Sequence, residues 1–320
     1  MTLKAFFEEY LERHAKVRKR TWAEDESKFN QYLASSVDGL NLAVRKLSTI
    51  KKSDLASLHT KIGKAHPATA NRVLALASSI FGRAIEWGLW EGQNPCKGIR
   101  RYKEVSRERF LQADELPRFF AALNAETNET IRDCLTMALL TGARRANVQA
   151  MRWEDITLSD ERNEWRIPRT KTGEPHRLPL VAAAVQILTR RRGDTDEEPE
   201  SPYVFPRVKD PTRREDDGRP GHIVELKRAW ARILKAAKLS DLRIHDLRRT
   251  LGSWQAAMGA SLQVIGKTLA HKNVSTTAIY SRLNLDPVRQ SLSEATNAIL
   301  AAGGMIPKGQ VKRMRKKAAR

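Results

Sequence analysis

The chain of 320 residues is strongly basic, with 58 Lys and Arg against 37 Asp and Glu and a formal net charge of +21. This length is sufficient for two compact domains, and a charge of this size favours a polyanionic partner such as nucleic acid. No apolar run is long enough to span a bilayer, and the early acidic residues Glu8 and Glu9 argue against a signal peptide or a basic membrane anchor. The two cysteines, Cys96 and Cys134, form no C-x-x-C pair, which indicates a reducing, cytoplasmic location and gives no metal site.

The first part of the chain has a helical pattern. Apolar residues recur at helical spacing between Leu3 and Leu11 and again between Val73 and Trp87, which predicts a small all-helical bundle over residues 1–96. Asn94-Pro95 interrupts this pattern, and the basic stretch 97–109 follows with few apolar residues. We interpret 97–109 as a flexible linker between two domains, although a surface loop would have the same composition.

The second part opens with a helix whose first turn is expected to contain Asp114 and Glu115, where the helix dipole favours acidic residues. The following helix has an apolar face that Thr141-Gly142 interrupts. Arg144 therefore follows a sharp break, from which its side chain can project into a cleft. Its neighbour Arg145 competes for the same role, and we interpret it as a contact to a backbone phosphate or as a solvated charge.

A β-hairpin is predicted next. Trp165–Pro168 and His176–Leu180 have the pattern of two strands, and the residues between them include a glycine suited to a turn. Lys171 lies in this turn, where its side chain can enter a groove. His176 is interpreted as either a structural residue or a contact to phosphate.

The segment His245-Asp-Leu-Arg248 begins a further predicted helix. His245 and Arg248 are three residues apart, so both can point at one phosphate. The opposite face is expected in the core and consists of Leu247, Leu251, Trp254 and Met258.

Two serines are expected to cap the helices that follow. Ser261 precedes a helix that leads to His271, and Ser275 precedes a short helix that carries Tyr280. An aromatic residue on a short helix is usually part of the core. The polar residues that accompany Tyr280 in this sequence favour a role as a nucleophile instead.

These polar residues form a set suited to phosphoryl transfer. A tyrosine hydroxyl has a pKa of about 10 and is a weak nucleophile near neutral pH, so it needs cations and proton acceptors around the group that it attacks. Two guanidiniums can bind phosphate oxygens and offset the charge of a pentacoordinate transition state. Imidazoles and an ammonium can transfer protons. The candidate residues in chain order are Arg144, Lys171, His245, Arg248, His271 and Tyr280.

The same residues, in this order, resemble the active site of tyrosine recombinases of the phage integrase family. The resemblance covers nearly the whole chain, and its strength lies in five short motifs in the expected order. The motifs are Thr141-Gly-Ala-Arg144, Thr170-Lys171-Thr-Gly, His245-Asp-Leu-Arg248-Arg-Thr, Leu269-Ala-His271-Lys and Thr276-Thr-Ala-Ile-Tyr280.

Two positions depart from the family pattern. An acidic residue is common three positions after the first arginine, and this chain has Asn147 there. We expect this change to affect how Arg144 is held in position more than the chemistry. The residue before the last histidine is usually glycine and here is Ala270. Because alanine is small, we expect little effect.

The resemblance implies a mainly α fold with a small β-hairpin or sheet, arranged as a two-domain DNA clamp. It divides the chain into a helical core-type DNA-binding domain (1–96), a basic linker (97–109), a tyrosine-recombinase catalytic domain with a C-terminal helix (110–302) and a basic tail (303–320). Family members that bind arm sites have an additional amino-terminal domain. The sequence leaves open whether this protein works without one or has been truncated.

The resemblance also implies a function, a site-specific DNA recombinase of integrase type. Tyr280 would attack the scissile phosphate to give a 3′-phosphotyrosine, Arg144 and Arg248 would stabilise the transition state, and Lys171 would protonate the leaving oxygen. The two histidines, His245 and His271, would assist proton transfer and phosphate binding. No cofactor or metal is expected.

Further contacts and partners follow from the same resemblance. Arg145, Arg249 and Lys272 are candidates for DNA binding. Strand exchange implies a tetramer on double-stranded DNA, coupled through the C-terminal helix, and accessory DNA-bending proteins are possible partners. Two alternatives stay open, a type IB topoisomerase that nicks and reseals one duplex and a DNA-binding regulator without catalysis.

Overall fold

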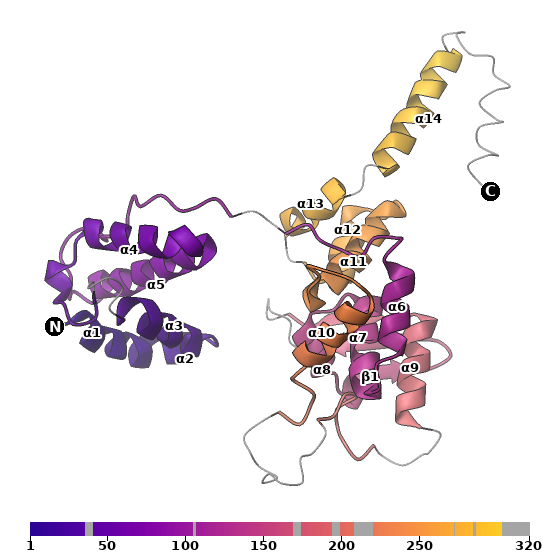
Figure 1. The fold of residues 1–320 in the computed structure, drawn as a ribbon, viewed down its shortest axis with the longest axis horizontal. Helices are drawn as coiled ribbons and strands as arrows, with labels where there is room; N and C mark the ends of the chain where they lie inside the picture. The colour runs from indigo at the N-terminus through magenta and orange to yellow at the C-terminus, as the bar shows by residue number, and fades with distance from the viewer. Residues whose placement is uncertain are drawn as a thin grey trace. The chain divides into compact units, whose positions relative to one another are not determined.

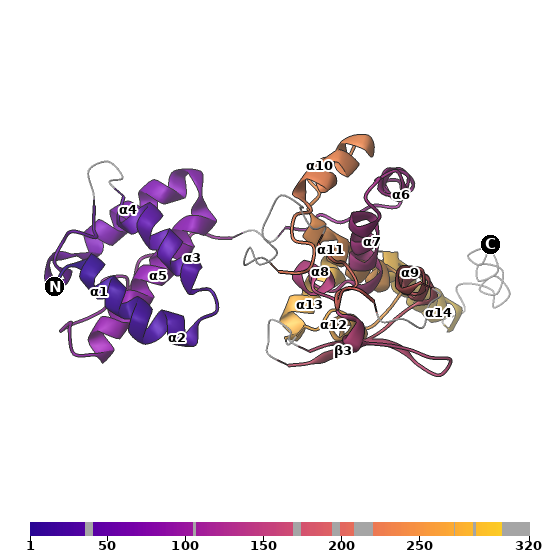
Figure 2. The same ribbon diagram turned by 90° about the horizontal axis from the view of Figure 1, so that it is seen from below.

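A computed structural model describes residues 1–35, 41–104, 107–168, 174–193, 199–207, 220–271, 273–283 and 286–302. The chain divides into two compact units, Met1–Arg107 and Glu108–Arg320, which are described separately below (Figures 1 and 2). The predicted linker, 97–109, includes this boundary.

The first unit is helical in its described residues. Its helices begin with α1 (Leu3–Tyr10), which continues through the π-helical turn η1 (Leu11–Ala15) into α2 (Lys16–Arg18). The remaining elements are α3 (Trp22–Lys28), the π-helical turn η2 (Phe29–Leu33), the 3-10 turn η3 (Leu47–Thr49), α4 (Lys52–Ala65) and α5 (Pro67–Glu86).

An aromatic cluster forms the core of this unit. Phe7 of α1 stacks on Phe29 with 3.8 Å between ring centroids and 2° between the planes, and Phe6 packs edge-on against Trp87 at 5.6 Å. Tyr10 is fully buried, and its hydroxyl lies 3.2 Å from the Ser79 hydroxyl on α5. These contacts join α1 to the long helix α5 by burial of apolar area.

The stretch after α5 is packed more tightly than its composition suggests. Asn71 on α5 accepts a hydrogen bond from the Tyr102 backbone N–H (3.0 Å) and donates to the Tyr102 carbonyl (2.9 Å) and to the Glu104 carboxylate (2.8 Å). The Tyr102 ring stacks on His59 of α4 at 4.7 Å. It fills the space over Gly63, where a Cβ atom would lie 2.2 Å from the ring. The expectation of a flexible linker is therefore wrong for the residues up to Glu104.

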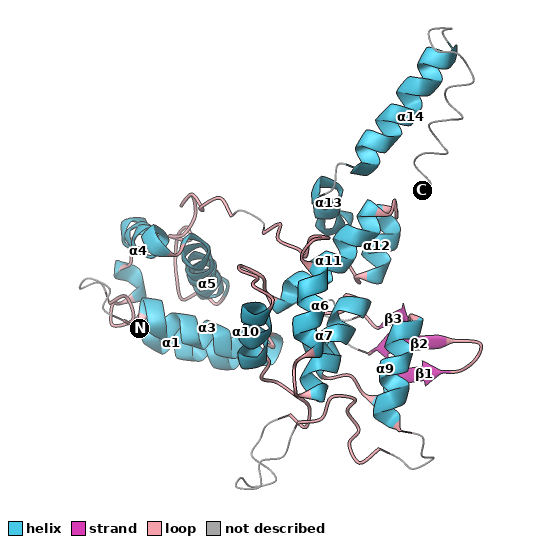
Figure 3. Ribbon diagram, turned by 45° about the vertical axis from the view of Figure 1, so that its right-hand side comes forward, coloured by secondary structure: helices cyan, strands magenta, loops and turns pink. Residues whose placement is uncertain are grey.

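The second unit contains most of the helices and the sheet (Figure 3). Before the sheet lie α6 (Leu116–Asn124), α7 (Glu129–Thr141), α8 (Arg145–Gln149) and the 3-10 turn η4 (Trp153–Asp155). After it lie α9 (Ala182–Arg192), α10 (Lys227–Ala236), α11 (Ile244–Ala257), α12 (Leu262–Thr268), α13 (Val274–Leu283) and α14 (Asp286–Ala302).

The sheet has three antiparallel strands in the order β1 (Ile156–Leu158), β2 (Asn163–Ile167) and β3 (His176–Pro179). Trp165 pairs with Leu178 and also with Ile156, so apolar side chains meet on the face that enters the core. The two predicted strands are confirmed. β1 was missed, because three residues after a helical turn carry too little alternation to be read as a strand.

Helix α7 runs through the core of this unit and also contains a buried carboxylate. Asp133 is 3% exposed and accepts hydrogen bonds from Arg190 (2.6 Å) and Arg191 (3.2 Å) of α9. A buried carboxylate is tolerated when it is paired in this way. The mainly helical fold with a small sheet is confirmed, and none of the described helices is long and apolar enough to cross a bilayer.

Two local predictions were wrong. Helix α6 begins at Leu116, so Asp114 and Glu115 precede it instead of forming its first turn. Met258 follows the end of α11 and is 82% exposed, because the chain turns away from the core there. Helix α13 begins at Val274, and the side chain of Ser275, its predicted cap, lies outside what the structure describes.

The network around Asn71 predicts a local effect on stability. Asn71→Ala removes hydrogen bonds to the Tyr102 backbone, and a partly buried donor or acceptor left unsatisfied costs about 1–3 kcal/mol. We expect trypsin to cleave after Arg100 and Arg101 faster in this variant than in the unmodified chain. Asn30→Ala, at an exposed position of the same unit, is the control, and equal cleavage of both variants would contradict the role given to Asn71.

Candidate active site

Five of the six predicted catalytic residues lie in described parts of the second unit, at the ends of α7 and α12 and on α11 and α13. Lys171 lies outside the described residues, as does Lys272, one of the predicted DNA contacts. A small cavity of about 10 Å³ lies beside two of these residues, Arg144 and Arg248. Its lining includes Arg144, Asn147, His176, Arg248 and Ala270.

Arg248 is the most deeply placed charge of the site. Its side chain is 5% exposed, and its guanidinium donates to the Gly142 carbonyl (2.6 Å) and to the Leu269 carbonyl. Burial, followed by the charge of Arg144, lowers its pKa to about 10, and Tyr280 acts in the opposite direction. No carboxylate forms an ion pair with Arg248 among the described residues. Carbonyl oxygens offset only part of the positive charge, so this buried guanidinium can still bind an anion.

Arg144 follows the break that the sequence predicted. Helix α7 ends at Gly142, which has the left-handed backbone conformation (φ 59°), and a Cβ atom there would lie 2.7 Å from Leu269. Only glycine meets both conditions. From the half-buried position that results, Arg144 donates to the Ala270 carbonyl at 3.4 Å, and desolvation lowers its pKa.

The two departures from the family pattern lie next to these arginines. Asn147 lines the cavity, but no hydrogen bond joins its side chain to Arg144 among the described residues. Ala270 has a left-handed backbone (φ 49°), in which a Cβ atom costs about 1–2 kcal/mol. The cost of alanine here comes from the backbone conformation and not from the size of the side chain, and the expectation of little effect on the site stays a prediction.

His271 is oriented by Thr277, a residue for which the sequence predicted no role in the site. Its Nδ1 lies 2.9 Å from the hydroxyl of Thr277, which is 1% exposed on α13. Desolvation lowers the pKa of His271 to about 4, and the charges of Arg248, Arg144 and His245 act in the same direction. The ring is neutral near pH 7. A threonine in the first turns of a helix gives no local signal of this role.

His245 and Arg249 occupy the start of α11. His245 is exposed at the edge of the site, and its pKa is lowered by desolvation and then by Arg248 and Arg249. Arg249 donates to the Asp246 carboxylate at 2.6 Å. Asp246 is fully buried and also accepts from the Arg243 backbone N–H (2.8 Å), which caps the helix. Arg145, the other predicted DNA contact in the described residues, is exposed.

Tyr280 is buried in this structure, with 3% of its surface exposed, and packs with Ile265 and Leu269. Its ring is parallel to that of His271, with 6.2 Å between centroids. It also lies against Gly252 of α11, where a Cβ atom would come within 2.7 Å of the phenol ring. Desolvation raises the pKa of Tyr280, and the charges of Arg248 and Arg249 lower it.

The described residues contain no group of three His, Cys, Asp or Glu side chains placed to bind a metal. Cys96 and Cys134 are free and buried, and burial raises the pKa of each thiol to about 12. These thiols are therefore protonated at neutral pH and poorly suited to metal binding or nucleophilic attack.

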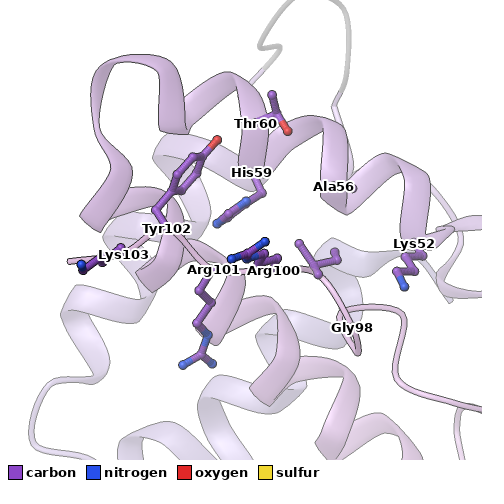
Figure 4. A pocket seen from close by; sticks show the side chains of 10 residues that line it. Lys52, Ala56, His59, Thr60, Gly98, Arg100, Arg101, Tyr102 and Lys103 are labelled. Atoms are coloured by element: carbon purple, nitrogen blue, oxygen red, sulfur yellow. The ribbon is translucent and has the colours of Figure 1, made fainter.

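A second basic feature lies on the first unit (Figure 4). It is a cleft of about 550 Å³ between α4 and the stretch after α5. His59 and Tyr102 lie together on one side of it, and the side chains that line it also include Lys52, Arg100, Arg101 and Lys103. The four basic residues are exposed, and none of the described residues that line the cleft is acidic.

The second unit thus brings together two guanidiniums, two imidazoles and a buried phenol, a set of side chains suited to binding and attacking a phosphate group. The family model described as the phage integrase family matches residues 109–286, more than half of the chain and most of this unit. The chain belongs to the phage integrase family.

Individual relatives are more distant. The integrase of Escherichia phage P2 is 26% identical over 233 residues, which cover 71% of this chain and 59% of that protein. The shufflon-specific DNA recombinase of Escherichia coli is 28% identical over 246 residues, 74% of this chain and 57% of the recombinase. The chain spans less than two thirds of the length of these relatives.

Solved structures share the fold. A lambda integrase dimer bound to a core site has a TM-score of 0.66 and 22% identity, over 86% of this chain and 97% of that chain. The Tn1549 transposon integrase in complex with circular intermediate DNA also has a TM-score of 0.66, with 14% identity over 88% of this chain and 95% of that chain.

The contact between Thr277 and His271 predicts a hydrogen bond at Nδ1. A hydroxyl can donate to Nδ1 or accept from its N–H, so the bond of about 1 kcal/mol forms with either tautomer. Thr277→Val removes it, so we expect the Nδ1 resonance of His271 to shift by NMR. Thr277→Ser keeps the hydroxyl and should give the spectrum of the unmodified chain. An unchanged Nδ1 resonance in the valine variant would contradict the proposed orientation.

The pKa of His271 predicts a dependence of stability on pH. Because its pKa is about 4 in the folded chain and 6.5 ordinarily, the unfolded chain binds more protons between these values. The contribution of His271 to stability is therefore complete above pH 6.5 and falls as the pH falls towards 4. We expect Tm to decrease less from pH 7 to pH 4.5 in His271→Asn than in the unmodified chain. The exposed His66→Asn is the control, and an equal decrease in all three proteins would contradict the prediction.

Proposed function

We propose that this protein is a site-specific DNA recombinase that cuts and rejoins DNA through a 3′-phosphotyrosine. The observation that carries the proposal is the buried Arg248, whose partners among the described residues are carbonyls and which lies with Arg144 and His271 beside a tyrosine. Membership of the phage integrase family supports the same function.

Tyr280 is the nucleophile in this proposal. Its oxygen forms a bond to the scissile phosphorus while the bond from phosphorus to the 5′ oxygen breaks. The phenol loses its proton as the bond forms, and the 5′ oxygen gains one as it leaves, which gives a free 5′-hydroxyl. Because the phosphotyrosine is still a phosphodiester, the reverse attack by a 5′-hydroxyl needs no nucleotide cofactor.

Each remaining residue has a role that follows from its chemistry. Arg144 and Arg248 bind the non-bridging oxygens and offset the charge of the transition state. His271, neutral and oriented by Thr277, can accept the phenol proton, and His245 assists at the exposed edge of the site. Lys171 protonates the leaving 5′ oxygen, a role assigned to it by the family motif.

We propose that the first unit binds DNA as well. The cleft between α4 and the stretch after α5 has four exposed basic residues and an aromatic pair, a composition suited to a phosphate backbone. In this assignment, residues 1–96 and the packed stretch up to Glu104 form the core-type DNA-binding domain, 110–302 the catalytic domain and 303–320 a basic tail. Arg145, Arg249 and Lys272 would contact DNA from the catalytic side.

The assembly proposed is a tetramer on DNA. Leu292 and Ile299 of α14 are 62% and 71% exposed, and this apolar surface is suited to docking on a neighbouring protomer. A tetramer on a Holliday junction is the state described for lambda integrase. Accessory DNA-bending proteins are further candidate partners. A DNA substrate agrees with a cytoplasmic location.

The test of the proposed function is a trap with nicked attachment-site DNA. The unmodified chain should form a covalent adduct that survives denaturing gel electrophoresis, and Tyr280→Phe should bind the DNA equally tightly without forming one. Specific binding with no adduct from the unmodified chain would favour a non-catalytic regulator. Adduct formation without exchange of markers between two sites would favour topoisomerase-like nicking and resealing.

A further inference from the structure

His176 occupies an unusual place for a residue outside the predicted catalytic set. It is the first residue of β3, pairs with Ile167 on β2 and lines the same small cavity as Arg144 and Arg248. Its ring hydrogen-bonds to the backbone of Thr268 at the end of α12. The residues that follow Thr268 provide the carbonyls for both arginines, Leu269 for Arg248 and Ala270 for Arg144.

One nitrogen of this ring has no partner in the part of the chain that the structure describes. Nε2 of His176 is buried and makes no hydrogen bond to any described residue. A buried polar atom without a partner destabilises the folded chain, and an apolar residue of similar size would avoid this cost. Each arginine of the cavity has a carbonyl oxygen as its partner, whereas this nitrogen has none.

The charges around the ring suit an anion. Desolvation lowers the pKa of His176, the positive charges of Arg248, Arg144 and Lys267 act in the same direction, and the hydrogen bond to Thr268 opposes them. The ring is therefore neutral at pH 7 in the free protein. In the neutral ring the single N–H donates to the Thr268 carbonyl, so Nε2 carries a lone pair. A phosphate between the two guanidiniums would offset their field and raise the pKa of His176, so that the ring takes up a proton from solvent and gains an N–H at Nε2 that points to a phosphate oxygen.

We propose that His176 is a further catalytic residue, which donates a hydrogen bond from Nε2 to a non-bridging oxygen of the scissile phosphate. The proposal rests on the recombinase function given above and adds a third imidazole to its phosphate site. The unpartnered nitrogen then has its partner only when DNA is bound, so the interaction forms on the substrate and not in the free protein.

The test combines variants with DNA in which a methyl group replaces one non-bridging oxygen of the scissile phosphate, as two separated diastereomers. His176→Leu should slow single-turnover formation of the covalent adduct about 10- to 100-fold on ordinary DNA. On the diastereomer that lacks the contacted oxygen, the same variant should slow the reaction less than threefold further, because the interaction is already absent.

Two further variants complete the design. His176→Gln keeps an N–H donor near the position of Nε2 and should recover part of the rate, which also covers the possibility that the leucine variant folds poorly. Arg177→Leu changes the next residue, whose side chain is exposed and pairs with Glu164. It should leave the rate unchanged.

The outcomes separate the proposal from the function on which it rests. Equal slowing by His176→Leu on ordinary DNA and on both diastereomers would overturn the phosphate contact and assign the residue to packing, as would the absence of any slowing. Absence of an adduct from the unmodified chain on ordinary DNA would instead refute the recombinase function.

Discussion

The active site depends on one buried cation whose partners are backbone carbonyls. Arg248 reaches the Gly142 carbonyl at the end of α7 and the Leu269 carbonyl at the end of α12, so a single guanidinium joins three helices. Carbonyl oxygens offset only part of a positive charge, and the lowered pKa of Arg248 reflects this. The Arg248 guanidinium therefore holds these helices together and can still bind an anion.

The ends of two helices, α7 and α12, position the other residues of the site around this cation. Gly142 ends α7 in a left-handed conformation so that Arg144 can turn inwards, and Ala270 adopts the same conformation before His271. Strain is accepted at Ala270, whereas glycine avoids it at Gly142. Two buried polar side chains then hold the functional residues in place. Thr277 contacts the ring of His271, and Asp246 caps the start of α11.

Sequence patterns predicted the parts of this arrangement that depend on neighbouring residues. The break at Gly142, the Ser261 cap and the two strands around residues 169–173 follow from local rules and are confirmed. The contacts of Asn71 with Tyr102, 31 residues away, have no local signal, and neither does the contact of Thr277 with His271. The exposure of Met258 shows the same limit, since helical periodicity predicts a face but not where the chain leaves the core.

The contact between Gly252 and Tyr280 makes the residue at position 252 depend on where the tyrosine lies, although the two positions are 28 residues apart. A side chain at position 252 and a phenol stored against α11 exclude each other, since the Cβ atom would lie 2.7 Å from the ring. A relative with a larger residue at this position must therefore keep its tyrosine elsewhere before the reaction. The residue on α11 becomes a marker, readable from sequence alone, of where an integrase stores its nucleophile.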